Sequence, residues 1–187
     1  MAKRDTKQIL INSFVELART KSIDKITVKQ ISENCGVTSQ TFYNHFPDKY
    51  ELVFWVYRRR VDIVFEKYYT GSVTREEGLK EYICGFKENS EFIINAFHNM
   101  NGQDSYINKT CKYLIQKMEK YYAEMKQTDK LPEKYRVYIK MYVFGMMNII
   151  ASWLAGEINM DEDEIVTALI KCLPQELVDF VRDNNIN

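Results

Sequence analysis

The chain has 187 residues, of which 45% are hydrophobic and 28% charged, as in ordinary soluble globular proteins. This length allows one large domain or two small ones around a proper core. Because 26 basic and 26 acidic side chains cancel, the net charge argues against a uniformly basic nucleic-acid-binding protein. The distribution is uneven, however: residues 1–60 hold 11 Lys+Arg against 6 Asp+Glu, which favours a DNA contact at that end.

Strand signals are nearly absent, and glycine and proline are scarce, at 7 and 3 residues. Large apolar residues recur at spacings of three and four, so we predict an all-helical fold without repeats. The first helix is expected over residues 5–19, with Phe14 and Leu17 on its inner face. It would brace the segment that follows.

Residues 27–49 read TVKQISENCGVTSQTFYNHFPDK and predict two short helices joined by a tight turn. Thr27 and Gln30 form the pattern of a capping box at the start of the first helix. Gly36 follows at the place where a left-handed residue ends a helix. Thr38 is a suitable cap for the second helix, which we expect to run to residue 45.

The second of these helices has two aromatic residues for inward packing, Phe42 and Phe46, and its other side chains are polar. Hydroxyls, amides and an imidazole without an apolar stripe are what a DNA major groove accepts. Two ordinary helices with a polar outer face would show the same pattern. The residues alone leave both interpretations open.

This segment resembles the helix-turn-helix of the TetR family of transcription regulators. Two departures are Cys35, where alanine is usual, and Gln40, where a small residue is common. The resemblance implies a three-helix DNA-binding head at residues 1–47 and a helical effector-binding and dimerisation body at 48–187. The positions that fall on the family pattern without a gap are Thr27, Ile31, Gly36, Val37, Thr41, Tyr43, His45, Phe46 and Lys49.

The resemblance also implies that Tyr43, His45 and Lys49 hold the phosphates of double-stranded DNA, while the neighbouring polar face reaches base edges. The chemistry agrees, since a lysine is a point charge for phosphate and Gln40 or Asn44 can bridge adenine in a bidentate way. The predicted DNA-binding residues are Thr27, Thr38, Ser39, Gln40, Thr41, Tyr43, Asn44, His45 and Lys49.

A helix from Pro47 to about residue 69 is expected next, with residues 52–57, apolar on all sides, buried between head and body. Arg58, Arg59 and Arg60 are interpreted as a solvated basic face, with DNA contact as the alternative. Further helices are predicted over residues 74–89, 90–99 and 105–127.

These middle helices carry many aromatic residues, which at helical spacing usually form a core. A buried tyrosine hydroxyl needs a partner, however, so a tyrosine cluster can also line a cavity with a few fixed polar groups. The resemblance adds that family members commonly hold a small-molecule effector there, and that the preceding helix relays its presence to DNA. The predicted effector-pocket residues are Tyr82, Phe86, Tyr106 and Tyr113.

The last two long helices, over residues 133–157 and from residue 161, have larger apolar stripes than one bundle needs to bury. Small residues on one face allow a second helix to approach closely. We therefore predict a two-fold homodimer on a palindromic operator. The predicted interface residues are Tyr138, Tyr142, Gly145, Ile149, Ser152, Trp153, Ile165 and Leu169.

The acidic run at residues 161–164 fits either a metal site or, more simply, acids at the positive end of a helix dipole. Pro174 should break this helix. Trp153, Gly156 and the acidic helix start resemble the C-terminal part of a TetR subgroup that includes DhaS-like regulators of dihydroxyacetone kinase operons. That likeness permits a protein co-regulator in place of a small molecule.

The four cysteines form no C-x-x-C pair and are predicted to be buried free thiols in a reducing cytosol, without a metal or other cofactor. Residues 1–7 are charged with no apolar core after them, and the apolar stretch 141–155 is shorter than the ~20 residues of a membrane span. We expect a cytoplasmic protein that does not contact a membrane.

An enzyme is the rival class. His45 belongs to the motif above, and His98 has no serine or cysteine nucleophile at a recognisable spacing. No glycine-rich phosphate loop or paired metal ligands occur. His98 could contact a ligand or lie satisfied at the surface. We predict a transcription regulator that is not an enzyme.

Overall fold

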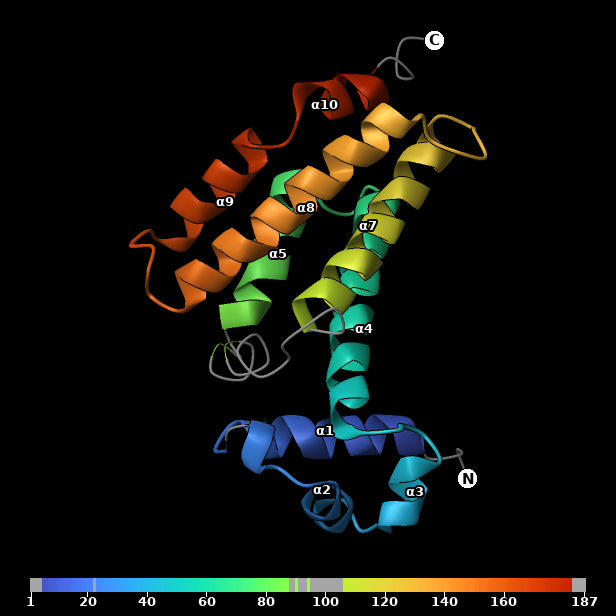
Figure 1. Cartoon of the computed structure of the whole chain (residues 1–187), viewed down its shortest axis with the longest axis vertical. Helices are drawn as coiled ribbons and strands as arrows, with labels where there is room; N and C mark the ends of the chain where they lie inside the picture. The colour runs from blue at the N-terminus through green and yellow to red at the C-terminus, as the bar shows by residue number, and fades with distance from the viewer. Residues whose placement is uncertain (1–4, 22, 88–89, 91–93, 95–105, 183–187) are drawn as a thin grey trace.

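The computed structural model describes residues 5–21, 23–87, 90, 94 and 106–182 (Figure 1). Within these ranges the chain forms helices and turns and no strand, which confirms the all-helical prediction. The helix expected over residues 90–99 and His98 lie outside the described ranges. The elements are α1 (Thr6–Ala18), the 3₁₀ turn η1 (Ile23–Lys25), α2 (Val28–Asn34), α3 (Ser39–Tyr43), α4 (Lys49–Tyr69), α5 (Arg75–Lys87), α7 (Tyr106–Met125), α8 (Glu133–Leu154), α9 (Glu162–Lys171) and α10 (Gln175–Arg182).

The helices form a small head and a larger body. Figure 1 shows α1, α2 and α3 together at one end, and α4 rising from them into the body. There the second half of α4 packs against α5 and α7, while α8, α9 and α10 form the opposite side. Because α4 is one unbroken helix, it connects the two parts directly.

Apolar packing and local capping position residues 27–49 in the head. The buried side chains there are Leu10, Phe14, Ile23, Ile26, Ile31, Phe42 and Phe46. The hydroxyl of Ser13 donates to the carbonyl of Ile31 at 2.7 Å and fastens α1 to α2. The capping box of Thr27 and Gln30 is present, and Gly36 has a φ of 72° at the turn. These features confirm the predicted helix-turn-helix.

Two helix boundaries differ from the prediction. Helix α3 ends at Tyr43, with Asn44 as its C-cap, and does not continue to His45. Helix α4 begins at Lys49, since the carboxylate of Asp48 accepts from the amide of Glu51 at 2.8 Å and serves as the N-cap. A side-chain cap fixes the start of α4 more strongly than the proline before it.

The arginines of α4 do not form one solvated face. Arg58 and Arg59 are exposed, as predicted, but Arg60 turns toward α5 and donates to the carbonyl of Glu81 at 3.3 Å. A Cβ at Gly85 would lie 1.3 Å from Cζ of Arg60, so the missing side chain at Gly85 provides the space for this guanidinium. The preceding turn is buried at Leu52, Val53 and Tyr57 and half-buried between them.

The acidic run before α9 caps the helix and binds α5. Asp161 and Glu164 form a capping box, with the amide of Glu164 donating to Asp161 at 2.9 Å. Lys87 pairs with Glu162 at 2.6 Å and Lys80 with Asp163 at 2.5 Å. This confirms the helix-start interpretation. Within the described residues, no cluster of three or more potential ligands could hold a metal ion.

The cysteines are free thiols, but they are not all buried. Cys111 is fully enclosed, and burial raises the pKa of its thiol to about 12. Cys35 and Cys84 are half-buried, and Cys172 is exposed beyond the end of α9. The prediction of a buried thiol therefore fails at Cys172, because the chain turns outward at the break before Pro174.

Candidate DNA-binding face and effector cavity

Helix α3 presents a polar face to solvent because Phe42 holds its other side in the core of the head. Gln40 and Asn44 are exposed, and the amide of Gln40 donates to Asn44 at 3.2 Å. The hydroxyls of Thr38 and Thr41 lie 2.9 Å apart at the start of the helix. Ser39 is half-buried beside them. The structure thus brings the predicted base-reading residues onto one surface.

Tyr43 and His45 border this surface. The side chain of Tyr43 is 53% exposed, with its ring edge-on to Phe42 at a centroid distance of 5.6 Å. His45 is exposed in the turn after the helix. Thr27 is also exposed at the start of α2, where its hydroxyl accepts from the amide of Gln30. These three positions are accessible to a phosphate backbone.

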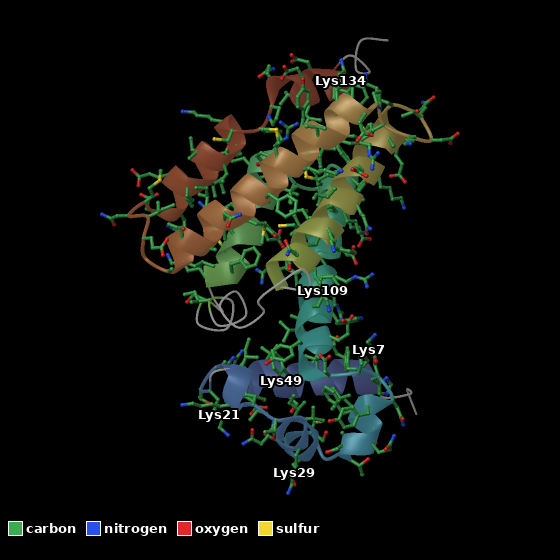
Figure 2. The ribbon with its side chains drawn as sticks, viewed as in Figure 1. Lys7, Lys21, Lys29, Lys49, Lys109 and Lys134 are labelled. Atoms are coloured by element: carbon green, nitrogen blue, oxygen red, sulfur yellow. The ribbon has the colours of Figure 1, made fainter. Side chains whose placement is uncertain are left out.

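Lys49 has a structural role that the sequence did not reveal. Its ammonium donates to the carbonyls of Ile23 and Ile26, at 2.7 and 2.9 Å, and so ties the start of α4 to the 3₁₀ turn η1. Figure 2 shows Lys49 inside the head, whereas Lys29 points away from it. The phosphate contact expected of Lys49 stays a prediction, and these two bonds give the ammonium a role within the head in addition.

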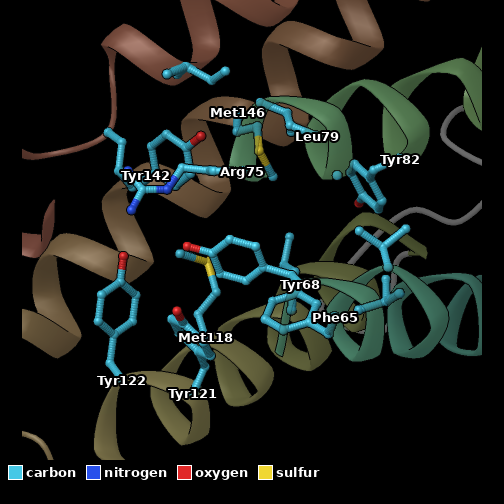
Figure 3. Close-up of a pocket in the computed structure, with 16 residues that line it drawn as sticks. Phe65, Tyr68, Arg75, Leu79, Tyr82, Met118, Tyr121, Tyr122, Tyr142 and Met146 are labelled. Atoms are coloured by element: carbon cyan, nitrogen blue, oxygen red, sulfur yellow. The ribbon is translucent and has the colours of Figure 1, made fainter. Parts of the chain in front are cut away.

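A cavity of about 130 Å³ lies in the body, between the second half of α4 and helices α5, α7, α8 and α9 (Figure 3). Its lining is predominantly apolar and aromatic, with one charged side chain. The lining residues are Val61, Val64, Phe65, Tyr68, Arg75, Gly78, Leu79, Tyr82, Leu114, Met118, Tyr121, Tyr122, Tyr142, Met146, Ile170 and Leu173.

Of the predicted pocket residues, only Tyr82 lines this cavity. Phe86 is buried behind Tyr82, at a ring-centroid distance of 4.7 Å. Tyr113 faces away, and its hydroxyl donates to Asp62 at 2.5 Å. The side chain of Tyr106 lies outside the described part of the structure. The prediction of effector-pocket residues is therefore corrected at Phe86 and Tyr113.

The residues that the prediction missed stand at one end of the cavity. Arg75 and Tyr68 flank the turn between α4 and α5, and Tyr122 and Tyr142 approach from α7 and α8. Burial raises the pKa of Tyr122 to about 12, and it raises the pKa of Tyr142 as well, so both phenols stay protonated at neutral pH. The tyrosine spacing alone could have suggested Tyr122; no sequence signal distinguishes Arg75 from a solvated helix-start residue.

Helix α8 has a second apolar face that points away from the body. Met141 is 70% exposed, and the Cβ of a residue at position 145 would meet no atom within 4 Å. The predicted interface residues Gly145 and Ile149 lie on this exposed face. It is formed by Val137, Met141, Phe144, Gly145, Ile149 and their polar neighbour Asn148.

Four other predicted interface residues point into their own protomer, where α8 packs mainly on α7 and α9 packs on α5. Tyr142 donates to the carbonyl of Leu169 at 3.1 Å, and the indole of Trp153 donates to Met160 at 2.8 Å. Ile165 and Leu169 are buried. The interface prediction is corrected at these four positions. Tyr138 and Ser152 are half-buried.

By length and composition, α8 is also the one described helix that could cross a membrane. Only 28% of its most apolar window is buried within the protomer. A core helix of a soluble protein passes the same test, and the buried side of α8 packs on α7 and α10. The apolar composition is therefore no evidence for a membrane.

The helical head with its exposed polar α3, joined to a larger helical body, defines the class of helix-turn-helix transcription regulators. A family model described as bacterial regulatory proteins, tetR family, matches residues 10–55. A second, described as transcriptional regulator C-terminal region, matches residues 74–175. The chain belongs to the TetR family of transcriptional regulators. Neither matched model describes an enzyme.

The curated relative is the HTH-type dhaKLM operon transcriptional activator DhaS of Lactococcus lactis subsp. lactis (strain IL1403), 31% identical over 52 residues. The match spans just over a quarter of each protein, 28% of this chain and 28% of that relative.

Solved structures of similar shape include a dihydroxyacetone kinase operon activator DhaS, with a TM-score of 0.65, 17% identity, and coverage of 94% of this chain and 98% of that one. A TetR transcriptional regulator from Rhodococcus sp. RHA1 has a TM-score of 0.65 and 17% identity, and the match covers 92% of this chain and 98% of that one. Thermus thermophilus FadR, a TetR family transcriptional repressor in complex with lauroyl-CoA, has a TM-score of 0.62 and 12% identity, and the match covers 93% of this chain and 94% of that one. At these identities the likeness shows a shared fold alone.

Proposed function

We propose that this chain is a cytoplasmic transcriptional repressor that binds a palindromic operator as a homodimer and releases it when a small molecule occupies the cavity. The observation that carries the proposal is the polar α3 face, with its linked Gln40 and Asn44, on a head richer in basic than acidic residues. Head and body divide at residue 48, since α4 starts there as an independently capped helix.

Homodimer formation is supported by the exposed apolar face of α8. A monomer would leave Met141, Phe144 and Ile149 in water beside an open glycine, and a second copy of α8 would bury them. Two heads related by a two-fold axis would read two half-sites about 34–36 Å apart, or a multiple of this distance.

The cavity supports control by a small molecule. Its walls include α4, which starts in the head, so a ligand that prefers one position of α4 would shift the affinity for DNA. The alternative is an activator controlled by a protein co-regulator; the short match to DhaS, a transcriptional activator, supports activation. A stable complex recovered from cell extract, with no small molecule altering DNA affinity, would support the alternative.

Selection of bound DNA from a random pool tests the DNA-binding function and finds the operator. We expect the selected sequences to contain an inverted repeat. Gln40→Ala should then lose about 1–3 kcal/mol of discrimination at one base pair of each half-site. Gln116→Ala, which removes an exposed glutamine from α7, is the matched control. Failure to enrich any sequence contradicts the proposal.

A further inference from the structure

The charge on the described lining of the body cavity is positive and unbalanced by any acidic side chain in that lining. Among the described residues that line it, Arg75 is the only charged one, and it is half-buried at the first position of α5. Within the described residues no aspartate or glutamate forms an ion pair with Arg75. Placing a guanidinium beside an apolar cavity without a carboxylate is unfavourable unless something else supplies the negative charge.

Tyrosine hydroxyls accompany this cation. Figure 3 shows the guanidinium of Arg75 and the hydroxyls of Tyr68 and Tyr122 at one side of the cavity, with Phe65 and Tyr82 at the other. Burial lowers the pKa of Arg75, but its interactions with Tyr68, Tyr122 and Tyr121 together more than offset this and the net shift of that pKa is upward. Arg75 is therefore a permanent cation.

Tyr122 has a donor to offer to a ligand. Although it is almost fully buried, its hydroxyl forms no hydrogen bond with another described residue. Tyr142 differs, since its proton is already committed to the carbonyl of Leu169 at 3.1 Å. The polar end thus presents one planar guanidinium and at least one phenol donor, which is the arrangement that a carboxylate accepts through both oxygens.

Away from Arg75 the lining is apolar and aromatic. Phe65 of α4 and Tyr82 of α5 lie on that side, and Leu79 lies along α5 between Arg75 and Tyr82 (Figure 3). The volume of about 130 Å³ is close to that of an engineered cavity of ~150 Å³ that binds benzene. It therefore fits a single ring or a short chain. A ligand of the size of lauroyl-CoA, which FadR of Thermus thermophilus binds, exceeds it.

We propose that the effector is a small monocarboxylate with an apolar body of roughly six to eight carbons, held with its carboxylate on Arg75 and Tyr122 and its apolar body against Leu79 and Tyr82. This assignment rests on the proposed effector-controlled function and names the chemical class of the effector. A neutral ligand would make no use of the charge on the half-buried Arg75, and a phosphate dianion would meet too few donors.

Calorimetric titration of the full-length protein without DNA tests this class. The probes are benzoate, phenylacetate and hexanoate, each compared with its primary amide, which has nearly the same shape and no charge. We expect at least one acid to bind, and its amide to bind tenfold more weakly or worse. An amide that binds as tightly as its acid, or a panel in which no acid binds, overturns the proposal.

Variants then locate the binding site. Arg75→Met should reduce acid affinity tenfold or more, Arg75→Lys less, and Tyr122→Phe several-fold. Lys112→Met removes an exposed cation from α7, another helix that lines the cavity, and should leave affinity unchanged. Acid affinity that is unchanged in both Arg75→Met and Tyr122→Phe overturns the assignment, and thermal unfolding of each variant verifies that it is folded.

Operator binding, measured separately, distinguishes the proposal of a carboxylate ligand from the proposal that the ligand controls DNA release. If the protein binds its operator and none of the acids, the ligand class is wrong while the DNA-binding function stands. If an acid binds through Arg75 but leaves operator affinity unchanged, the cavity assignment stands and the effector-controlled release is wrong.

Discussion

The hydroxyl of Tyr57 on α4 lies 2.9 Å from the hydroxyl of Tyr82 on α5, and the latter also donates to the sulfur of Met147 on α8 at 3.3 Å. Tyr82 lines the cavity, and Tyr57 is buried in the part of α4 that approaches the head. A ligand that displaces the ring of Tyr82 therefore acts directly on α4.

A double-mutant cycle of Tyr57→Phe and Tyr82→Phe should show coupling. Each single change removes one hydroxyl of a buried pair, so we expect each to lower the free energy of unfolding by about 1–2 kcal/mol. The double variant should lose less than the sum, by roughly 0.5–1.5 kcal/mol, because it leaves neither hydroxyl behind. Urea unfolding measures all four proteins; strictly additive losses would show that the pair is not coupled.

Lys49→Met should destabilise the head, since it removes the ammonium that holds the carbonyls of Ile23 and Ile26. Hydrogen bonds to a charged group contribute about 1.5–3 kcal/mol, so we expect a loss of roughly 2 kcal/mol in unfolding free energy. Lys29→Met is the control, because Lys29 is exposed and has only a 3.8 Å pair with Glu33. If Lys49→Met is as stable as the control and loses only DNA affinity, Lys49 acts on phosphate instead.

Tyr43→Phe should weaken binding to all DNA sequences alike, by about 1 kcal/mol, since the exposed phenol on the border of the α3 face is predicted to contact phosphate and not bases. Competition titrations with operator variants measure both strength and preference. A changed order of preference among the variants would place Tyr43 on a base edge.

Gly145→Leu should separate the subunits without harming the fold of each one. Apart from its own stretch of α8, no described part of the protomer lies within 4 Å of a Cβ at this position, so a partner helix would meet the new side chain. We expect sedimentation of a monomer at micromolar concentration and weak operator binding. Gln116→Leu, an equally exposed change on α7, should remain dimeric. A wild-type protein that sediments as a monomer would refute the interface itself.

The raised pKa of Tyr122 predicts that the free energy of unfolding falls at alkaline pH. Burial raises the pKa of its phenol to about 12, above the ordinary value near 10, so the protonated phenol favours the folded state. Its contribution, roughly 2–3 kcal/mol, is complete below pH 10 and is lost as the pH rises to 12. The free energy of unfolding of Tyr122→Phe should therefore fall less steeply than that of the wild type between pH 10 and 12. Equal slopes would contradict this.

Features set by neighbouring residues could be predicted from the sequence. The capping boxes at Thr27 and at Thr74, and the positive φ of Gly36, depend on residues three positions apart or fewer. The polar face of α3 follows in the same way from the inward position of Phe42.

Features set by packing between distant elements could not be predicted from the sequence. Helix α8 is apolar on two faces, and no periodicity says which of them packs within the protomer, so Tyr142 and Trp153 were assigned to the wrong face. Arg75 stands beside a capping threonine, as solvated residues do, and only the fold places it at a cavity. The bonds of Lys49 cross more than twenty positions of the sequence.

The continuity of α4 makes it a lever. Its 21 residues span about 30 Å at 1.5 Å per residue, with the cavity beside one end and the recognition helix beside the other. A pivot of about 10° at the cavity end would carry the other end through roughly 5 Å without breaking a hydrogen bond of the helix. Successive base pairs are about 3.4 Å apart, so that arc exceeds one step along the DNA. In the proposed homodimer, a ligand small enough to fit beside Arg75 would need only this rotation to put both heads out of register with their half-sites.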